Sequence, residues 1–163
     1  GVNRRRGETL EVCGRPNTKW SKLSQLQLVR YAEYYAKMEF ASYGFAVYTS
    51  EVDDHGVDFI AKRPAGSIFY EVQVKAVRNY NYTGIAKSKL KLEGRMLLCY
   101  LLFEDDRLPD VYVIPATVWL AENDVFKGYT DKSADQWGVN ISKKNLPMLE
   151  QYAADCMLPE LTP

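Results

Sequence analysis

Two β-prone stretches on either side of a strong turn signal constrain the fold of this chain more than any other feature. Residues Gly56–Arg63 and Ile68–Val77 are rich in β-branched and aromatic side chains, and the turn formers of Pro64–Ser67 lie between them. Proline and glycine preset the backbone angles of tight turns, and strand-like runs joined in this way usually pair. We therefore expect residues 56–77 to form an antiparallel hairpin.

A helix followed by a strand is expected before the hairpin. The helix is predicted from Ser21 or Lys22 to Tyr43, with Gly44 at the left-handed position where many helices end. The strand is predicted over Phe45–Thr49, which is rich in aromatic and β-branched residues. The helix prediction depends on apolar residues that recur at the spacing of one helix face, namely Leu23, Leu26, Val29, Ala32, Ala36 and Phe40.

The second half of the chain predicts two further strands and a closing helix. The strands are expected over Arg95–Phe103 and Val111–Ile114, and the helix over Ser142–Met157 with Ser142 as its cap. The polar, tyrosine-rich stretch Arg78–Lys91 is assigned no element. Together these elements predict an α+β (α/β) domain with a mixed β-sheet flanked by helices. Residues 1–20 are interpreted as an irregular N-terminal arm and residues 21–163 as a single domain.

Composition narrows the class of protein. The longest apolar run, Met96–Phe103, is far shorter than the roughly 18 residues of a membrane span, so we expect a soluble, cytoplasmic protein without a membrane partner. The cysteines Cys13, Cys99 and Cys156 are odd in number and widely spaced, which fits neither a disulfide framework nor a zinc site. Basic and acidic residues balance at 21 each, so binding to nucleic acid would need a local patch or a metal ion.

Polar residues alternate along the second strand of the expected hairpin. Glu71, Gln73 and Lys75 fall on one face of that strand, and the apolar residues between them fall on the other. A solvated sheet face gives the same alternation, so this pattern alone does not identify a site. Asp58 lies in the partner strand, however, and pairing can bring its carboxylate beside Gln73 and Lys75.

These three side chains together have the chemistry of phosphodiester hydrolysis. The Asp58 carboxylate and the Gln73 side-chain carbonyl offer the oxygen ligands that Mg²⁺ or Mn²⁺ requires. Lys75 could orient the attacking water, lower its pKa and stabilise the charge that grows on the phosphate.

The order of these motifs resembles a known family. Gly56-Val57-Asp58, followed after a turn by Glu71-Val72-Gln73-Val74-Lys75, resembles the signature of the PD-(D/E)XK nuclease superfamily. It is most similar to the Mrr-type, Holliday-junction-resolvase-like variant, in which glutamine replaces the acid of the second motif.

The resemblance implies a restriction-endonuclease-like αβββαβ core and a role for each motif residue. Asp58 would bind the metal, Gln73 would take the acidic position and Lys75 would be the catalytic lysine. The first helix of the family often adds a metal-binding glutamate, which would be Glu33, although Glu39 is also available.

Two further sequence features belong to the resemblance. Glu71-Val72-Gln73 offers a second register, with Glu71 as the acid, but the first register is preferred because it retains the lysine. Pro109–Pro115 and Gln136–Asn140 are similar to an uncharacterised bacterial branch of the superfamily, and this similarity implies no activity.

Candidate contacts to nucleic acid follow the second motif. They are Arg78, Lys87, Lys89 and Lys91, interleaved with Tyr80 and Tyr82, and they could contact phosphates and stack on bases. A solvated loop with ordinary charges explains the same pattern. His55, the only histidine, is interpreted as part of a solvated turn and is left outside the site.

The sequence therefore predicts a Mg²⁺-dependent DNA endonuclease of restriction or junction-resolving type, and it does not distinguish DNA from RNA. A two-fold homodimer would provide two sites for cutting both strands. One alternative is a catalytically inactive nucleic-acid-binding or assembly subunit with the same fold. The other is an α+β protein-interaction domain in which Lys75 lies on a wet face and Asp58 belongs to a turn.

Overall fold

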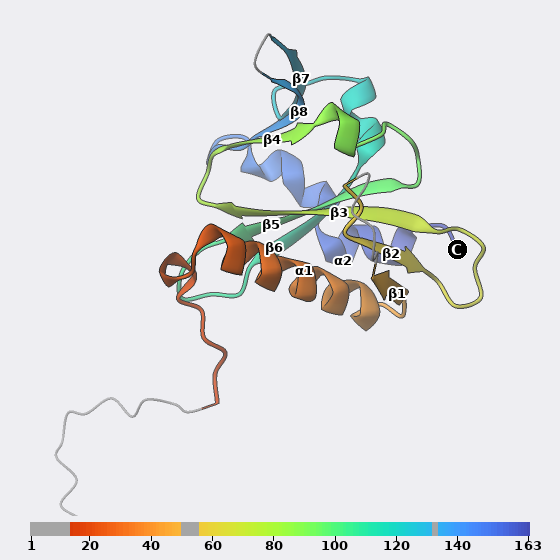
Figure 1. The fold of residues 1–163 in the computed structure, drawn as a ribbon, viewed down its shortest axis with the longest axis horizontal. Coiled ribbons are helices and arrows are strands. Elements are labelled where there is room, and N and C mark those ends of the chain that lie inside the picture. The colour runs from red at the N-terminus through yellow and green to blue at the C-terminus, as the bar shows by residue number, and fades with distance from the viewer. Residues whose placement is uncertain (1–13, 50–55, 132–133) are drawn as a thin grey trace, which may run out of the picture.

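The computed structural model describes residues 14–49, 56–131 and 134–163, which form two β-sheets and one long helix (Figure 1). The main sheet contains β1 (Ala46–Thr49), β2 (Phe59–Lys62), β3 (Tyr70–Arg78), β5 (Met96–Phe103) and β6 (Asp110–Pro115). The smaller sheet contains β4 (Tyr82–Ala86), β7 (Phe126–Thr130) and β8 (Asp135–Asn140). In Figure 1 the helix lies below the main sheet and the smaller sheet lies above it.

The main sheet is mixed, as the sequence predicts. Its strand order is β1-β2-β3-β5-β6. The expected hairpin is confirmed, because β2 pairs antiparallel with β3 and places Phe59 opposite Val72. The central strands β3 and β5 run parallel, with Lys75 opposite Tyr100, and β6 is antiparallel to β5. The prediction of an α+β domain with a mixed sheet is thus confirmed.

The long helix α1 (Gln25–Ser42) begins later than expected. Residues 20–22 form a separate 3-10 turn, η1 (Trp20–Lys22), and α1 starts after the capping residue Ser24. The Gln27 backbone N–H donates to Ser24 Oγ (3.2 Å), and the Ser24 N–H donates to Gln27 Oε1 (2.9 Å), which satisfies two donors at the helix start. Gly44 follows the helix with φ +88°, as the sequence predicts.

Helix α1 covers one face of the main sheet. Its buried residues are Leu28, Ala32, Ala36 and Phe40, and they pack in a core that includes Val72 and Val74 of β3. Leu26, which was expected on this face, is 72% exposed. The buried face of α1 therefore follows Leu28, Ala32, Ala36 and Phe40, which recur every four residues, and Leu26 lies off this face.

The smaller sheet covers the opposite face of the main sheet and was not predicted. Its buried residues Ile85, Phe126 and Val139 share a second core with Leu98 and Tyr100 of β5. The strand order is β4-β8-β7, and both pairs are antiparallel. Each of these short strands contains a glycine, which weakens the β signal in the sequence.

The connection between the parallel strands β3 and β5 differs from the αβββαβ core that the resemblance implies. Residues 79–95 contain β4 and the 3-10 turn η2 (Lys87–Lys89), and no α-helix. The expectation of a helix at this place is wrong. Since β4 pairs with β8, the crossover is held by a sheet rather than by a helix.

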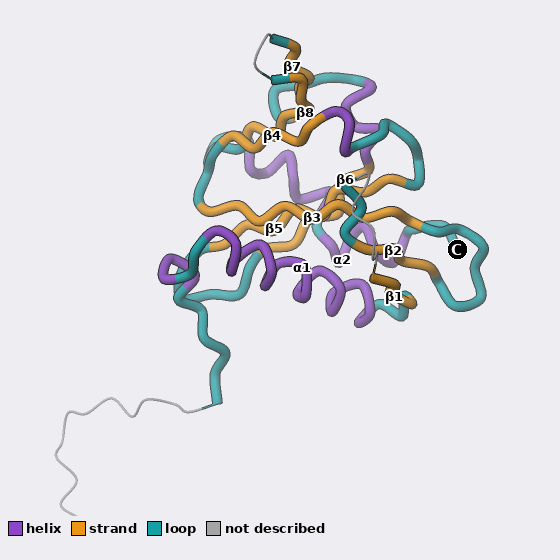
Figure 2. Tube along the Cα trace, viewed as in Figure 1, coloured by secondary structure: helices purple, strands orange, loops and turns teal. Residues whose placement is uncertain are grey.

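The C-terminal segment is not the single helix that was expected over Ser142–Met157. It contains η4 (Leu146–Tyr152), α2 (Ala154–Met157) and η5 (Leu158–Glu160), which Figure 2 shows as short helical pieces. Ala153 is extended and forms a bridge to Tyr112 of β6, so the helical backbone is interrupted where the chain crosses the sheet edge. Ser142 still accepts a hydrogen bond from the Asn145 N–H (3.3 Å).

The chain also contains η3 (Ala116–Leu120) after β6. The C-terminal residues pack on the turn between β2 and β3, where Gly66 lies against Pro163. Arg63 donates to the carbonyls of Leu158 (2.8 Å) and Leu161 (3.2 Å), and the Tyr70 hydroxyl donates to that of Thr162 (2.8 Å). Within the described ranges, no helix has the length and apolar character needed to cross a membrane.

Candidate active site

Asp58 is fixed against β3 by its main chain and by its side chain. Its N–H donates to the Val72 carbonyl (2.8 Å), and Asp58 Oδ2 accepts from the Val74 N–H (2.6 Å). A carboxylate that accepts from a backbone N–H is a strong and geometrically specific contact. The half-buried Asp58 side chain is therefore held at the open end of the β2–β3 hairpin.

A pocket of about 370 Å³ lies between α1 and the residues that lead into β2. Glu33 and Asp58 both line it, so the structure brings together the helix glutamate and the motif aspartate. Glu39, the alternative glutamate, lines a different pocket with Asp110 and Asp155. Of the two helix residues considered from the sequence, Glu33 is thus the one that lies near Asp58.

The same pocket contains two cations that the sequence analysis did not single out. Arg30 and Lys37 lie three residues before and four residues after Glu33 on α1, and both line the pocket. Residues at this spacing share one helix face, and that pattern could have identified them. The pocket therefore combines carboxylates that can hold a cation with basic groups that can attract phosphate.

Lys75 is half-buried on the face of β3 that points toward the smaller sheet. Burial lowers the pKa of Lys75, the nearby charge of Lys89 lowers it further, and the carboxylate of Asp58 opposes both effects. Asp58 therefore lies within electrostatic reach of Lys75 as well as in the Glu33 pocket. Lys75 and Gln73 are not among the described residues that line this pocket.

Gln73 is buried, with 7% of its surface exposed. Its side-chain amide lies against two main-chain carbonyls, and with the nitrogen on that side it donates to Lys89 O (3.3 Å) and to Gly56 O. Gly56 has φ +76°, and a Cβ at this position would lie 2.5 Å from the Gln73 amide. The amide thus joins the loop before Asp58 to η2, and its role as a metal ligand stays a prediction.

Glu71 lies on the same face of β3 but is exposed, opposite Ile60 of β2 and Met96 of β5. Its N–H donates to the Arg95 carbonyl (2.9 Å). Nothing in this arrangement favours the second register over the first, and the catalytic role of Glu71 stays a prediction.

The four basic residues predicted to bind nucleic acid have different environments. Arg78 turns inward, where its guanidinium donates to the carbonyls of Trp20 (3.0 Å) and Leu23 (2.6 Å) and holds η1 in place. Lys87 forms an ion pair with Asp135 of the smaller sheet (3.1 Å), whereas Lys89 and Lys91 are exposed. Only the last two are therefore free to face a ligand in this conformation.

Two carboxylates, those of Glu33 and Asp58, line the pocket and are the described groups there that could bind a divalent cation. Within residues 14–49, 56–131 and 134–163, no group of three or more His, Cys, Asp or Glu side chains could hold a metal ion. Mg²⁺ commonly uses one or two protein carboxylates together with waters and substrate phosphates. Glu33 and Asp58 supply two carboxylates at this pocket, and metal binding there stays a prediction. His55 lies outside the described residues.

No family model matches this chain, and no curated protein matches it. The structure is similar to that of Hjc, a Holliday junction resolvase from the hyperthermophilic archaeon Archaeoglobus fulgidus, with a TM-score of 0.49 and 12% sequence identity. The match covers 74% of this chain and 88% of that chain.

Proposed function

We propose that this chain is a divalent-metal-dependent nuclease domain of the PD-(D/E)XK type that hydrolyses phosphodiester bonds in DNA. The observation that carries the proposal is the position of Asp58. Its carboxylate is fixed on β3 by the Val74 N–H (2.6 Å), shares a pocket with Glu33, and lies within electrostatic reach of Lys75. Two carboxylates that can bind a cation, with a lysine near one of them, form one combination that can promote phosphodiester hydrolysis.

Each residue has a distinct role in this proposal. Asp58 and Glu33 would hold Mg²⁺ or Mn²⁺, and the bound cation would supply Lewis-acid activation of the scissile phosphodiester. Lys75 would place a positive charge and a hydrogen-bond donor beside the phosphate oxygen on which charge develops. Arg30 and Lys37 would position the flanking phosphates, because phosphate contacts fix the register of a nucleic acid.

Gln73 would have a positioning role in the proposed site. Its amide bonds to the carbonyls of Gly56 and Lys89 hold the loop that leads to Asp58. The side chain would act on the position of Asp58 rather than on the substrate.

The proposal is tested by nicking of supercoiled plasmid and of a branched DNA at low salt. Wild-type protein is expected to cut in Mg²⁺ or Mn²⁺ and not in EDTA, and Asp58→Asn is expected to lower the rate at least about 100-fold. Asp110→Asn is the matched control, because Asp110 is half-buried like Asp58 but lies in β6. Cutting that survives Asp58→Asn would place the active site elsewhere.

The arrangement of Gln73 favours a second candidate, a nucleic-acid-binding subunit without activity. The residue in the acidic position of the motif is an amide occupied by main-chain carbonyls. Well-folded protein that binds DNA but does not cut it in Mg²⁺ or Mn²⁺ would support this alternative.

Cutting both strands of a duplex would need two copies of the single site in each chain. We propose a two-fold homodimer on the DNA for this reason alone. Sedimentation of the protein with and without a short duplex measures its oligomeric state. A protein that is monomeric both when free and when bound to DNA would contradict the dimer.

A further inference from the structure

The smaller sheet has two faces of different character. Ile85, Phe126 and Val139 point toward the main sheet and are buried. The opposite face is defined by the strand register, which places Gly84 beside Gly138, Lys127 on the other side of Gly138, and Tyr129 beside Gln136. We call this the outer face; its residues are Tyr82, Gly84, Ala86, Lys127, Tyr129, Gln136, Gly138 and Asn140.

Two tyrosines meet over a glycine at the centre of the outer face. Tyr82 and Tyr129 are each 39% exposed, and their rings lie 5.5 Å apart at 87°. A Cβ on Gly138 would lie 2.6 Å from a Tyr82 ring carbon and 2.8 Å from a Tyr129 ring carbon. The absent side chain therefore lets both rings rest on the main chain of the central strand.

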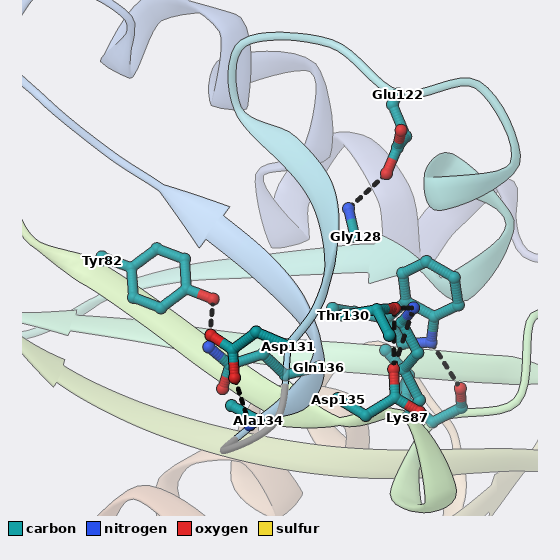
Figure 3. Close-up of polar contacts among 11 residues, drawn as sticks. Tyr82, Lys87, Glu122, Gly128, Thr130, Asp131, Ala134, Asp135 and Gln136 are labelled. Carbon is teal, nitrogen blue, oxygen red and sulfur yellow. Dashed lines mark hydrogen bonds and ion pairs between the residues drawn. The ribbon is translucent and has the colours of Figure 1, made fainter.

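A hydrogen bond to its hydroxyl also fixes the ring of Tyr82. Gln136 Nε2 lies 2.6 Å from the Tyr82 hydroxyl and donates to it (Figure 3). Two aromatic rings that are exposed, yet fixed by packing and a hydrogen bond, offer contact area without a large loss of side-chain entropy on binding.

The outer face carries one charged side chain, and it is positive. Lys127 is its charged side chain; it is exposed, and it makes no ion pair with the described residues. The nearby acid Asp135 belongs to the other face, where it pairs with Lys87 (3.1 Å), as Figure 3 shows. Asp131, in the loop after β7, accepts from the Ala134 N–H (2.8 Å).

We infer that the outer face of the smaller sheet binds unpaired bases of single-stranded nucleic acid. Bases would stack on Tyr82 and Tyr129, and Lys127 would contact the backbone phosphate beside them. Exposed aromatic side chains next to basic groups are the recurring solution for binding single strands, because each base has a π-face.

Binding of single strands at the outer face would add a substrate preference to the proposed nuclease function. Strand β4 follows β3, which carries Lys75, along the chain, and the two strands belong to the two different sheets. A DNA with an opened strand or a branch would use both. The inference rests on the proposed function for the choice of DNA as the ligand, but the binding itself needs no cleavage.

The test is the affinity for a fluorescent oligo-dT at low salt in EDTA, measured by anisotropy. The double variant Tyr82→Ala/Tyr129→Ala is expected to bind at least about tenfold more weakly, since stacking on one aromatic ring is worth about 1–3 kcal/mol per base. Tyr82→Phe/Tyr129→Phe keeps both rings and should bind within about threefold of wild type. Phe69→Ala, which removes a 48% exposed ring from the β2–β3 turn, is the matched control and should have no effect.

An abasic oligomer of the same length separates stacking from charge. Wild type should bind it more weakly than oligo-dT, and the double tyrosine variant should lose no further affinity for it. Equal wild-type affinity for the two oligomers would overturn the inference, and so would unchanged oligo-dT affinity in a double variant shown by circular dichroism to be folded. Failure of wild type to bind any single strand would also overturn it and leave the face to a protein partner.

The two proposals fail separately in this design. Wild type that binds oligo-dT through the tyrosines but cuts no DNA contradicts the nuclease proposal and supports the outer-face inference. Metal-dependent cutting, together with oligo-dT binding that is unchanged in the double tyrosine variant, supports the nuclease proposal and contradicts the outer-face inference.

Discussion

The two sheets of this domain are stabilised in different ways. Every residue of β5, from Met96 to Phe103, is buried, because α1 covers one face of the main sheet and the smaller sheet covers the other. The smaller sheet has one buried face and one exposed face, and its centre is a contact between tyrosine rings and the main chain at Gly138. Apolar burial thus dominates the first sheet, and close approach to glycine organises the second.

The two sheets offer different surfaces to a ligand. The fully buried strand β5 has no free face, so the candidate groups of the main sheet lie elsewhere: Lys75 is half-buried within β3, and Asp58 precedes β2. Only one face of the smaller sheet packs against the main sheet. The other face carries fixed aromatic and polar side chains. Rigid elements of this kind suit binding sites because they hold side chains in a defined geometry.

The largest change in stability is expected in β5. Leu101→Ala should lower the free energy of unfolding by about 2–5 kcal/mol, because the side chain is fully buried and its removal leaves a cavity. Urea unfolding monitored by fluorescence measures this change. Leu120→Ala is the control, since Leu120 is exposed, and it should change stability by less than about 0.5 kcal/mol. Similar losses for both variants would contradict the burial of β5.

A smaller loss is expected at the centre of the second sheet. Gly138→Ala should cost about 1–3 kcal/mol, because its Cβ would overlap the rings of Tyr82 and Tyr129 and force them to move. Gly94→Ala introduces the same group where no atom lies within 4 Å and should be neutral or stabilising. The two unfolding midpoints are compared directly, and equal values would refute the close approach at Gly138.

A gain in stability is expected between the two sheets. The Tyr100 hydroxyl is buried without a well-formed hydrogen bond, so Tyr100→Phe should raise the free energy of unfolding by about 1 kcal/mol. Burial raises the pKa of Tyr100 from 10.0 to about 12, with a smaller opposing effect from Thr83.

The stability difference between Tyr100→Phe and wild type should also depend on pH. Because the raised pKa belongs to the folded state, the contribution of Tyr100 to stability is complete below pH 10 and is lost as pH rises from about 10 to about 12. Thermal unfolding at several pH values should therefore show a growing advantage of Tyr100→Phe over wild type in this window. A constant difference would mean that Tyr100 is not buried as described.

The smallest effect is expected at the surface of the second sheet. Asp135→Asn removes the ion pair with Lys87, and the loss should not exceed about 1 kcal/mol because the Asp135 side chain is largely exposed. Lys87 keeps its bond to Thr130 (3.0 Å) and its place over the Trp137 ring (4.5 Å). Thermal unfolding in low and high salt measures the change, and a larger, salt-independent loss would contradict a surface pair.

The main sheet was predictable from the sequence because its signals are local. The turn at Pro64–Ser67 set the β2–β3 hairpin, and the apolar run of β5 was long enough to stand out. The smaller sheet was missed because its strands are short and contain glycine, and because β4 pairs with β8 across a long stretch of sequence. The tail was predicted as one helix because periodicity does not report the bridge from Ala153 to Tyr112.

The candidate site was predictable in part for the same reason. Alternation placed Gln73 and Lys75 on one face of β3, and pairing of the hairpin placed Asp58 near them. Alternation does not reveal whether a further layer covers that face, so the burial of Gln73 beneath Gly56 and Lys89 could not be foreseen. The inward turn of Arg78 depends on carbonyls of η1 that are distant in sequence.

We propose that Asp58 and Lys75 act together in the hydrolysis of DNA, and replacement of Lys75 tests this proposal most directly. The measurement is single-turnover cleavage of a labelled branched DNA in Mg²⁺ by wild type, Lys75→Met and the control Lys62→Met, which removes a lysine from the neighbouring strand β2. Lys75→Met should cleave at least about 100-fold more slowly than wild type with unchanged DNA affinity, and Lys62→Met should cleave normally. Equal rates for Lys75→Met and wild type would contradict the claim.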